Sequence, residues 1–241
     1  MGTKGVTRTE ALTLELDNVK IWDLDKIEEA ITFSETVLTA VQDLPPDFAD
    51  DFSQVDPNWY APPGAAPPEC MNAEEAMMSI TGGSMKYSIL NCQVGILQYA
   101  ELQYANYVLQ MDINFQGTPL NFNFRKWSQS PLDGDVLLDY LLHHDGTWGF
   151  SVWRNGDLVE GMDGNTSLDF SKPVTITIIN KSPAFIVFSD SSLLTLYNTQ
   201  EAYTGPFLLD FIVNSWEVTP TETLTLELDN VKIWDLDKIE Y

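Results

Sequence analysis

A chain of 241 residues is long enough for one large domain or two small ones, and 44% hydrophobic residues suffice for a core, which excludes disorder throughout. The 36 acidic residues against 12 basic ones give a net charge of −24, so nucleic acids and anionic membranes are disfavoured as partners. No run of about 18 apolar residues is present, so we expect no membrane insertion.

The first element in chain order is one copy of a repeat. Residues 12–28 (LTLELDNVKIWDLDKIE) recur letter for letter at 224–240. Either the gene carries tandem modules or one segment has been duplicated, and the position of the copies favours tandem modules. On this interpretation residues 1–28 are the C-terminal strand of a preceding module, residues 29–46 are a linker, and residues 47–241 form the next module.

The linker region is polar and ends in Pro45-Pro46, with room for a short helix at 33–41. The prolines of 60–69 (YAPPGAAPPE) exclude a central strand and predict a long loop. Cys70 follows this loop and Cys92 is the second of the two cysteines. They would form a disulfide in an exported protein, closing a loop of about 22 residues for roughly 3 kcal/mol; two free thiols are the alternative.

The rest of the chain has the pattern of short strands. Apolar and polar residues alternate in two segments, 107–115 and 120–124. Runs of β-branched or aromatic residues follow at 136–142, 150–153, 174–179, 185–188, 193–197 and 207–213. Turn signals separate them, and Asn155-Gly156 gives the strongest hairpin signal. This spacing predicts an all-β fold, a two-sheet antiparallel β-sandwich or a barrel, with an N-terminal extension.

The repeated strand contains a change of phase. Leu224, Leu226 and Leu228 share one phase, whereas Val231 and Ile233 are in the other. The slip at 229–230 predicts a β-bulge that turns Asp229 toward a rim.

Two stretches resemble a known family. Residues 50–53 (DDFS), followed by Asn58-Trp59, resemble the opening of concanavalin A-like or laminin-G-like jelly-roll modules of large bacterial surface proteins. Residues 228–236 (LDNVKIWDL) resemble their closing strand. The resemblance covers about residues 47–237 and implies a two-sheet jelly roll with its first and last strands side by side.

The resemblance also implies a structural calcium ion near those ends. Asp50, Asp51 and Asp229 would supply the oxygen ligands that calcium requires. The alternative is that these aspartates only decorate an acidic rim.

Catalytic patterns are weak in this sequence. A glycoside hydrolase needs two carboxylates close together, and the nearest candidates, Glu227 and Asp229, are interpreted as solvent-facing polar positions. His143 and His144 are adjacent, so on a strand they point to opposite faces and cannot grip one metal ion. We therefore predict that the chain is not an enzyme.

Aromatic residues suggest carbohydrate as a possible ligand. Most aromatic side chains of a sandwich belong to its core. Trp127, beside Arg125-Lys126, and Trp148, near Gly146, are the tryptophans expected to be exposed, where a sugar ring would stack on them.

These observations predict a non-catalytic structural or adhesive repeat module, extracellular or at the cell surface. A carbohydrate-binding, lectin-like module is the alternative, and a glycoside hydrolase is a more distant one. The surplus N-terminal strand, with Leu12, Leu14, Leu16, Val19 and Ile21, predicts self-assembly by strand exchange. The expected partners are the chain itself or neighbouring copies of the module, and polysaccharide.

Overall fold

A computed structural model describes residues 24–60, 77–90, 94–116, 121–130, 134–166, 172–203, 207–214 and 223–240. The proposed strand-exchange residues Leu12, Leu14, Leu16, Val19 and Ile21 lie outside the described residues, as does most of the predicted proline-rich loop. Cys70 and Cys92 lie outside them too, so their pairing stays a prediction. Of the helices in the described part of the chain, none has the length and apolar character needed to cross a membrane.

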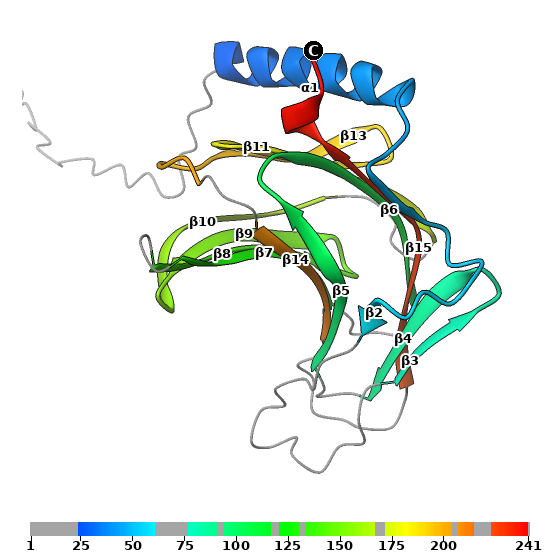
Figure 1. The fold of residues 1–241 in the computed structure, drawn as a ribbon. Helices are drawn as coiled ribbons and strands as arrows, with labels where there is room; N and C mark the ends of the chain where they lie inside the picture. The colour runs from blue at the N-terminus through cyan, green and yellow to red at the C-terminus, as the bar shows by residue number, and fades with distance from the viewer. Residues whose placement is uncertain are drawn as a thin grey trace, which may run out of the picture.

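The described strands form two antiparallel sheets that face each other (Figure 1). The described part of one sheet is eight-stranded. Seven of its strands follow the order β13 (Ser192–Asn198), β12 (Ala184–Ser189), β11 (Val174–Lys181), β6 (Tyr107–Gln116), β15 (Thr223–Asp235), β4 (Ser84–Leu90), β3 (Met77–Thr81). The eighth strand, β1 (Phe48–Asp50), pairs with β15. The described part of the other is seven-stranded, in the order β10 (Asp157–Asn165), β9 (Thr147–Arg154), β8 (Gly134–His143), β7 (Asn121–Ser130), β14 (Phe207–Asn214), β5 (Val94–Tyr104), β2 (Trp59–Tyr60). The predicted all-β, two-sheet antiparallel sandwich is confirmed, and β1 and β15, near the two ends of the sandwich, lie side by side.

The core lies between the sheets, and some strands alternate buried with half-buried residues. β9 follows this pattern along its length, with Phe150 and Val152 facing inward. Aromatic rings join the two layers: the Phe150 ring centroid lies 4.7 Å from that of Phe185 on β12 and 4.7 Å from that of Tyr197 on β13. Such contacts between rings of opposite sheets fix how the sheets pack.

Two local predictions from the sequence are confirmed. The β15–β6 pairing shifts register between Asp229 and Lys232, and Asn230 has a φ of 50°, so the predicted bulge is present. Asn155 and Gly156 join β9 to β10 with φ values of 52° and 86°, as a tight hairpin turn requires.

Helix α1 (Leu24–Gln42) packs on the outer face of the eight-stranded sheet, at the top of Figure 1. It is longer than the predicted helix at 33–41 and occupies most of the region predicted to be a linker. Its buried Val37 and Val41 contact Val108, Ile179 and Trp234 on the strands beneath, in a second apolar cluster separate from the main core. The division into modules stays a prediction, but the helix belongs to the sandwich described here.

The repeat adopts two conformations at its end. Leu24 to Glu28 lie in the first turns of α1, whereas the identical Leu236 to Glu240 begin as the short 3-10 helix η2 (Leu236–Lys238). In the first copy the helix continues through the following residues, and this extension stabilises a first turn that would be unstable alone. In the second copy the Leu236 amide donates to the Asn106 carbonyl at 3.1 Å and its side chain is buried, so tertiary contacts determine the shorter element.

Removing part of the helix contact should destabilise the whole domain. We expect Val37→Ala to lower the free energy of unfolding by about 1–2 kcal/mol, because Val37 is fully buried against the sheet. Thr36→Ala, at an exposed neighbouring position, is the matched control. Equal denaturation midpoints for the two variants would contradict the packing of α1 on the sheet.

Candidate functional site

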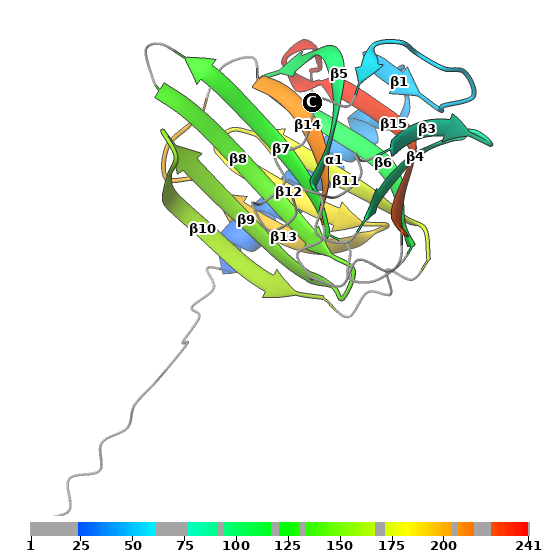
Figure 2. The same ribbon diagram turned by 90° about the horizontal axis from the view of Figure 1, so that it is seen from below.

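The outer face of the seven-stranded sheet is turned away from helix α1. Figure 2 looks onto this face, with α1 on the far side of the molecule. On β8 and β9 the residues out of phase with the core, among them Leu137, Asp139, Ser151 and Trp153, are half-buried. This face therefore presents side chains that the core does not use.

In-register pairing aligns polar residues across this face. Each is the partner of the next one on the neighbouring strand, and they run from β2 to β9 in the order Tyr60, Gln98, Asp210, Arg125, Asp139, Ser151. We call this set the polar row. The Tyr60 hydroxyl donates to Gln98 Oε1 at 2.6 Å, and Gln98 Nε2 donates to Asp210 Oδ2 at 3.2 Å.

The neighbouring row of register positions is apolar. It runs from β14 to β10 in the order Leu208, Trp127, Leu137, Trp153, Leu158. We call this set the apolar row. The Trp153 Nε1 group donates to Ser151 Oγ at 2.8 Å, which ties the indole of the apolar row to the polar row.

An ion pair stands at the centre of the polar row. Arg125 Nε and Nη2 each donate to one oxygen of Asp210 at 3.0 Å, a two-pronged contact. The Asp210 side chain is 1% exposed, so its charge depends on Arg125 and Gln98 for compensation. Asp139 is the next residue of the row, half-buried and opposite both Arg125 and Ser151.

Two of the predicted calcium ligands, Asp50 and Asp229, lie on the paired strands β1 and β15. Asp50 accepts hydrogen bonds from the Phe52 amide and from Trp59 Nε1, both at 2.7 Å. Asp51 accepts from the Ser53 amide at 3.0 Å. Among the described residues no group of three or more His, Cys, Asp or Glu side chains is placed to hold a metal ion. Bound calcium stays a prediction from the sequence resemblance.

The two predicted sugar-binding tryptophans have different outcomes. Trp148 was expected to be exposed, but it is buried in the core, where its ring lies 6.3 Å from Tyr140. The prediction is wrong because Trp148 is in phase with Phe150 on β9, whereas Trp153 follows the opposite phase. Trp127 lies on β7 opposite Leu137, and its side chain lies outside the described part of the structure.

The other residues considered for chemistry lie elsewhere. Glu227 is on β15, where it accepts from Lys86 Nζ at 2.5 Å and Asn114 Nδ2 at 3.0 Å. With Asp229 and Asp112 it lines a hollow of about 380 Å³ on the eight-stranded sheet. A second hollow, of about 640 Å³, lies between α1 and that sheet. Neither hollow includes a residue of the polar or the apolar row.

Sequence reasoning missed Arg125, Asp139, Asp210 and Trp153 as members of one site. The alternation on β8 and β9 was a usable signal, because it separates Asp139 and Trp153 from the core residues between them. The strand order was not available from one sequence, and Asp210 lies more than 70 residues after Asp139. Only the pairing of β14 with β7 brings them to one face.

No protein-family profile matches the sequence, and no curated protein matches it. Solved structures do share the fold. A beta-glucanase of Bacillus licheniformis is 14% identical with a TM-score of 0.59, covering 80% of this chain and 99% of its own. A glycoside hydrolase family 16 endo-glucanase from Bacteroides ovatus is 9% identical (TM-score 0.63, 77% of this chain and 99% of that one). The catalytic domain of an endo-1,3-beta-glucanase (laminarinase) from Thermotoga petrophila is 11% identical (TM-score 0.60, 78% and 96%).

These likenesses confirm the concanavalin A-like jelly roll and correct the functional prediction. We predicted a non-catalytic structural or adhesive repeat and no enzyme. The three solved proteins named above, which share this fold over nearly their whole length, are glucanases, one of them a laminarinase. The prediction was wrong because it took the weak carboxylate pattern on β15 as the only place where catalytic residues would stand.

The ion pair between Arg125 and Asp210 should stabilise the folded state. We expect Arg125→Met to lower the free energy of unfolding by about 3 kcal/mol, because it leaves Asp210 buried without its partner. The double variant Arg125→Met with Asp210→Leu should recover most of this loss. Lys232→Met, on β15, serves as control. Urea unfolding measures all four proteins, and a double variant no more stable than Arg125→Met would contradict the pairing.

Asp229 should destabilise the folded chain at neutral pH. Burial raises the pKa of Asp229, and the charges of Asp112, Asp51 and Asp50 raise it further, although the Asn230 amide opposes them. Folding thus favours the protonated form, so stability falls as pH rises from the unfolded value of about 3.9 through the raised folded value. We expect Asp229→Asn to raise Tm at pH 7 but not in acid.

Thermal melts at both pH values, with and without millimolar calcium, measure this effect. Asp43→Asn, at an exposed position, is the control. If Asp229 binds calcium, Asp229→Asn will lower Tm in the presence of calcium. That result would contradict the prediction that burial and the neighbouring aspartates make charged Asp229 destabilising, and it would support the metal site.

Proposed function

We propose that the chain is a glycoside hydrolase that binds a β-glucan chain across the outer face of the seven-stranded sheet. The observation that carries the proposal is the polar row beside the apolar row, on a fold that known glucanases share. A polysaccharide substrate also suits an extracellular protein, which we include in the proposal.

The two rows match the two surfaces of a sugar. A pyranose ring has apolar faces that pack on indole and aliphatic side chains, and a rim of hydroxyl groups that need hydrogen-bond partners. Trp153 and Leu137 supply the first kind of surface, while Ser151, Asp139 and Tyr60 supply the second. Because both rows cross the strands, the glucan chain is expected to cross them as well.

Asp139 is the residue that we assign to the chemistry. Glycoside hydrolysis uses one carboxyl group as proton donor and a second as nucleophile or as base for water. Asp139 lies in the polar row between Arg125 and Ser151 and is half-buried, accessible to a substrate on this face. Asp210 is fully buried with both oxygens bound by Arg125, so it is suited to orienting Arg125 beside Asp139 rather than to proton transfer.

The second carboxylate is not next to Asp139 on the same strand. Positions two residues away on that face are Leu137 and Leu141. Asp135 shares the face of β8 four residues earlier and is exposed, which makes it the candidate to test. Their Cα atoms are about 13 Å apart on a regular strand. This separation excludes a retaining pair, and it allows the roughly 6.5–9.5 Å of an inverting pair only if the two carboxyl groups lean toward each other.

Hydrolysis of laminarin and of mixed-linkage β-glucan tests the proposal through release of reducing ends. We expect Asp139→Asn to reduce kcat by about 10²–10⁴-fold, the usual contribution of an acid or base group. Asp135→Asn should reduce it too, while Asp43→Asn, on the loop after α1, should not. Full activity of Asp139→Asn would contradict the assignment of Asp139. Binding of glucan by the wild type without any hydrolysis would contradict the catalytic part of the proposal.

A further inference from the structure

The β9–β10 hairpin at one end of the apolar row has an inverted burial pattern. Leu158 pairs with Trp153, and the next pair is Glu160 with Val152, so Val159 is the extra residue of a bulge. With regular pairing Val159 would face the core opposite Val152, and Glu160 would face outward. The structure does the reverse: Glu160 is 9% exposed, whereas Leu158 and Val159 are 57% and 46% exposed.

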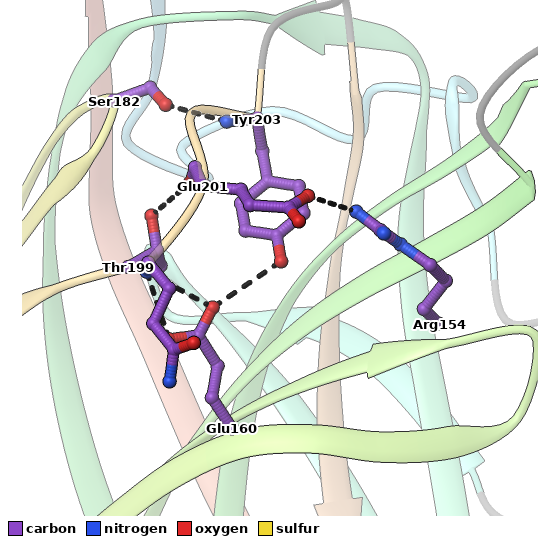
Figure 3. A network of polar contacts seen from close by, with 7 residues as sticks. Arg154, Glu160, Ser182, Thr199, Glu201 and Tyr203 are labelled. Atoms are coloured by element: carbon purple, nitrogen blue, oxygen red, sulfur yellow. Dashed lines mark hydrogen bonds and ion pairs between the residues drawn. The ribbon is translucent and has the colours of Figure 1, made fainter.

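Burying a carboxyl group is unfavourable unless hydrogen bonds compensate it. Figure 3 shows Glu160 together with Tyr203, one of the residues that hold it. The Tyr197 hydroxyl donates to Glu160 Oε2 at 3.0 Å, and the Tyr203 hydroxyl donates to Glu160 Oε1 at 3.3 Å. The backbone N–H of Gln200 donates to Glu160 Oε2 at 3.0 Å. Burial and the hydrogen bond to Glu160 together raise the pKa of Tyr197 to about 12, so the hydroxyl remains a donor.

The segment that supplies these donors is itself fixed. Thr199 Oγ1 donates to the Glu201 carbonyl at 2.6 Å, and the Tyr203 amide donates to Ser182 Oγ at 2.8 Å. Arg154, at the end of β9, donates to Glu201 Oε2 at 2.6 Å (Figure 3). The bulged strand β10 is thus tied to the connection between β13 and β14, which joins the two sheets.

A hairpin that buries a glutamate and exposes a valine departs from the usual burial of apolar residues and exposure of charged ones. Such exceptions are expected where function requires them. The exposed Leu158 is in register with Trp153, so the apolar row extends from the proposed glucan-binding face to β10, the edge strand of the sheet.

We infer that Leu158 and Val159 bind a further sugar residue of the glucan chain beyond Trp153, and that Glu160 is the positioning residue that holds them outward. This inference rests on the proposed function and extends it to the length of substrate that the face recognises. The aliphatic pair contacts the apolar face of the distal sugar and takes no part in bond cleavage.

Kinetics on a series of β-glucan oligosaccharides of increasing length test the inference. Leu158→Ser and Val159→Ser should raise KM for the longer oligosaccharides by about three- to tenfold, the loss of one partly buried apolar contact, and leave kcat unchanged. Short oligosaccharides, which do not reach the hairpin, should show no change. Leu44→Ser, which is 42% exposed on the loop after α1, is the matched control.

Substitution of Glu160 tests its positioning role. Glu160→Ala should reproduce the length-dependent rise in KM, because the bulge loses the group that holds it. Glu160→Gln keeps a carbonyl oxygen for the tyrosine hydroxyls and should restore KM at least in part. A loss of folding alone would lower activity equally on short and long oligosaccharides, so the ratio of the two separates the explanations.

The outcomes distinguish the inference from the proposal beneath it. A wild-type protein that hydrolyses no β-glucan overturns both. A wild-type protein that hydrolyses β-glucan, while both serine variants keep its KM at every length, overturns the role of Leu158 and Val159 and leaves the proposed function standing.

Discussion

In-register antiparallel pairing of the seven-stranded sheet is the constraint on which the proposed site depends. Side chains alternate between the faces of a strand, and neighbouring strands lie about 4.8 Å apart. A residue facing outward on β8 therefore has fixed neighbours on β7 and β9, here Arg125 and Ser151 beside Asp139. A slip of one residue would turn Asp139 into the core and Tyr140 out of it. The aromatic core thus sets the register, and the register sets the site.

The two sheets use their outer faces differently. The eight-stranded sheet carries apolar residues outward at Val108, Ile179 and Trp234, and helix α1 covers them. The seven-stranded sheet instead carries Asp139 and Trp153 at half-buried outward positions. This asymmetry assigns packing to one outer face, and the other outer face is where we propose that a glucan binds.

Local patterns predicted the fold well. Alternation, turn residues and the phase slip in the repeat gave the sandwich, the Asn155-Gly156 hairpin and the bulge at Asp229. They failed where tertiary contacts decide. The pentapeptide LDKIE begins a long α-helix at Leu24, whereas at Leu236 it begins only a short 3-10 helix. Trp148 has polar and glycine neighbours in the sequence, which suggested exposure, but it lies on the core side of its strand.

The candidate site could not be predicted as a whole from the sequence, because its members come from strands that are distant along the chain. Asp210 and Gln98 meet only because β14 inserts between β5 and β7, a strand order that no local pattern records. The resemblance of the opening and closing segments was informative about the fold, since β1 does pair with β15. It said nothing about the opposite sheet, where the two rows lie.

A crystal structure with a β-glucan oligosaccharide bound to the Asp139→Asn protein tests the central claim most directly. The account predicts the sugar chain across β7, β8 and β9, with one ring packed on Trp153 and a glycosidic oxygen beside residue 139. An oligosaccharide bound under helix α1, or on any surface of the eight-stranded sheet, would contradict it.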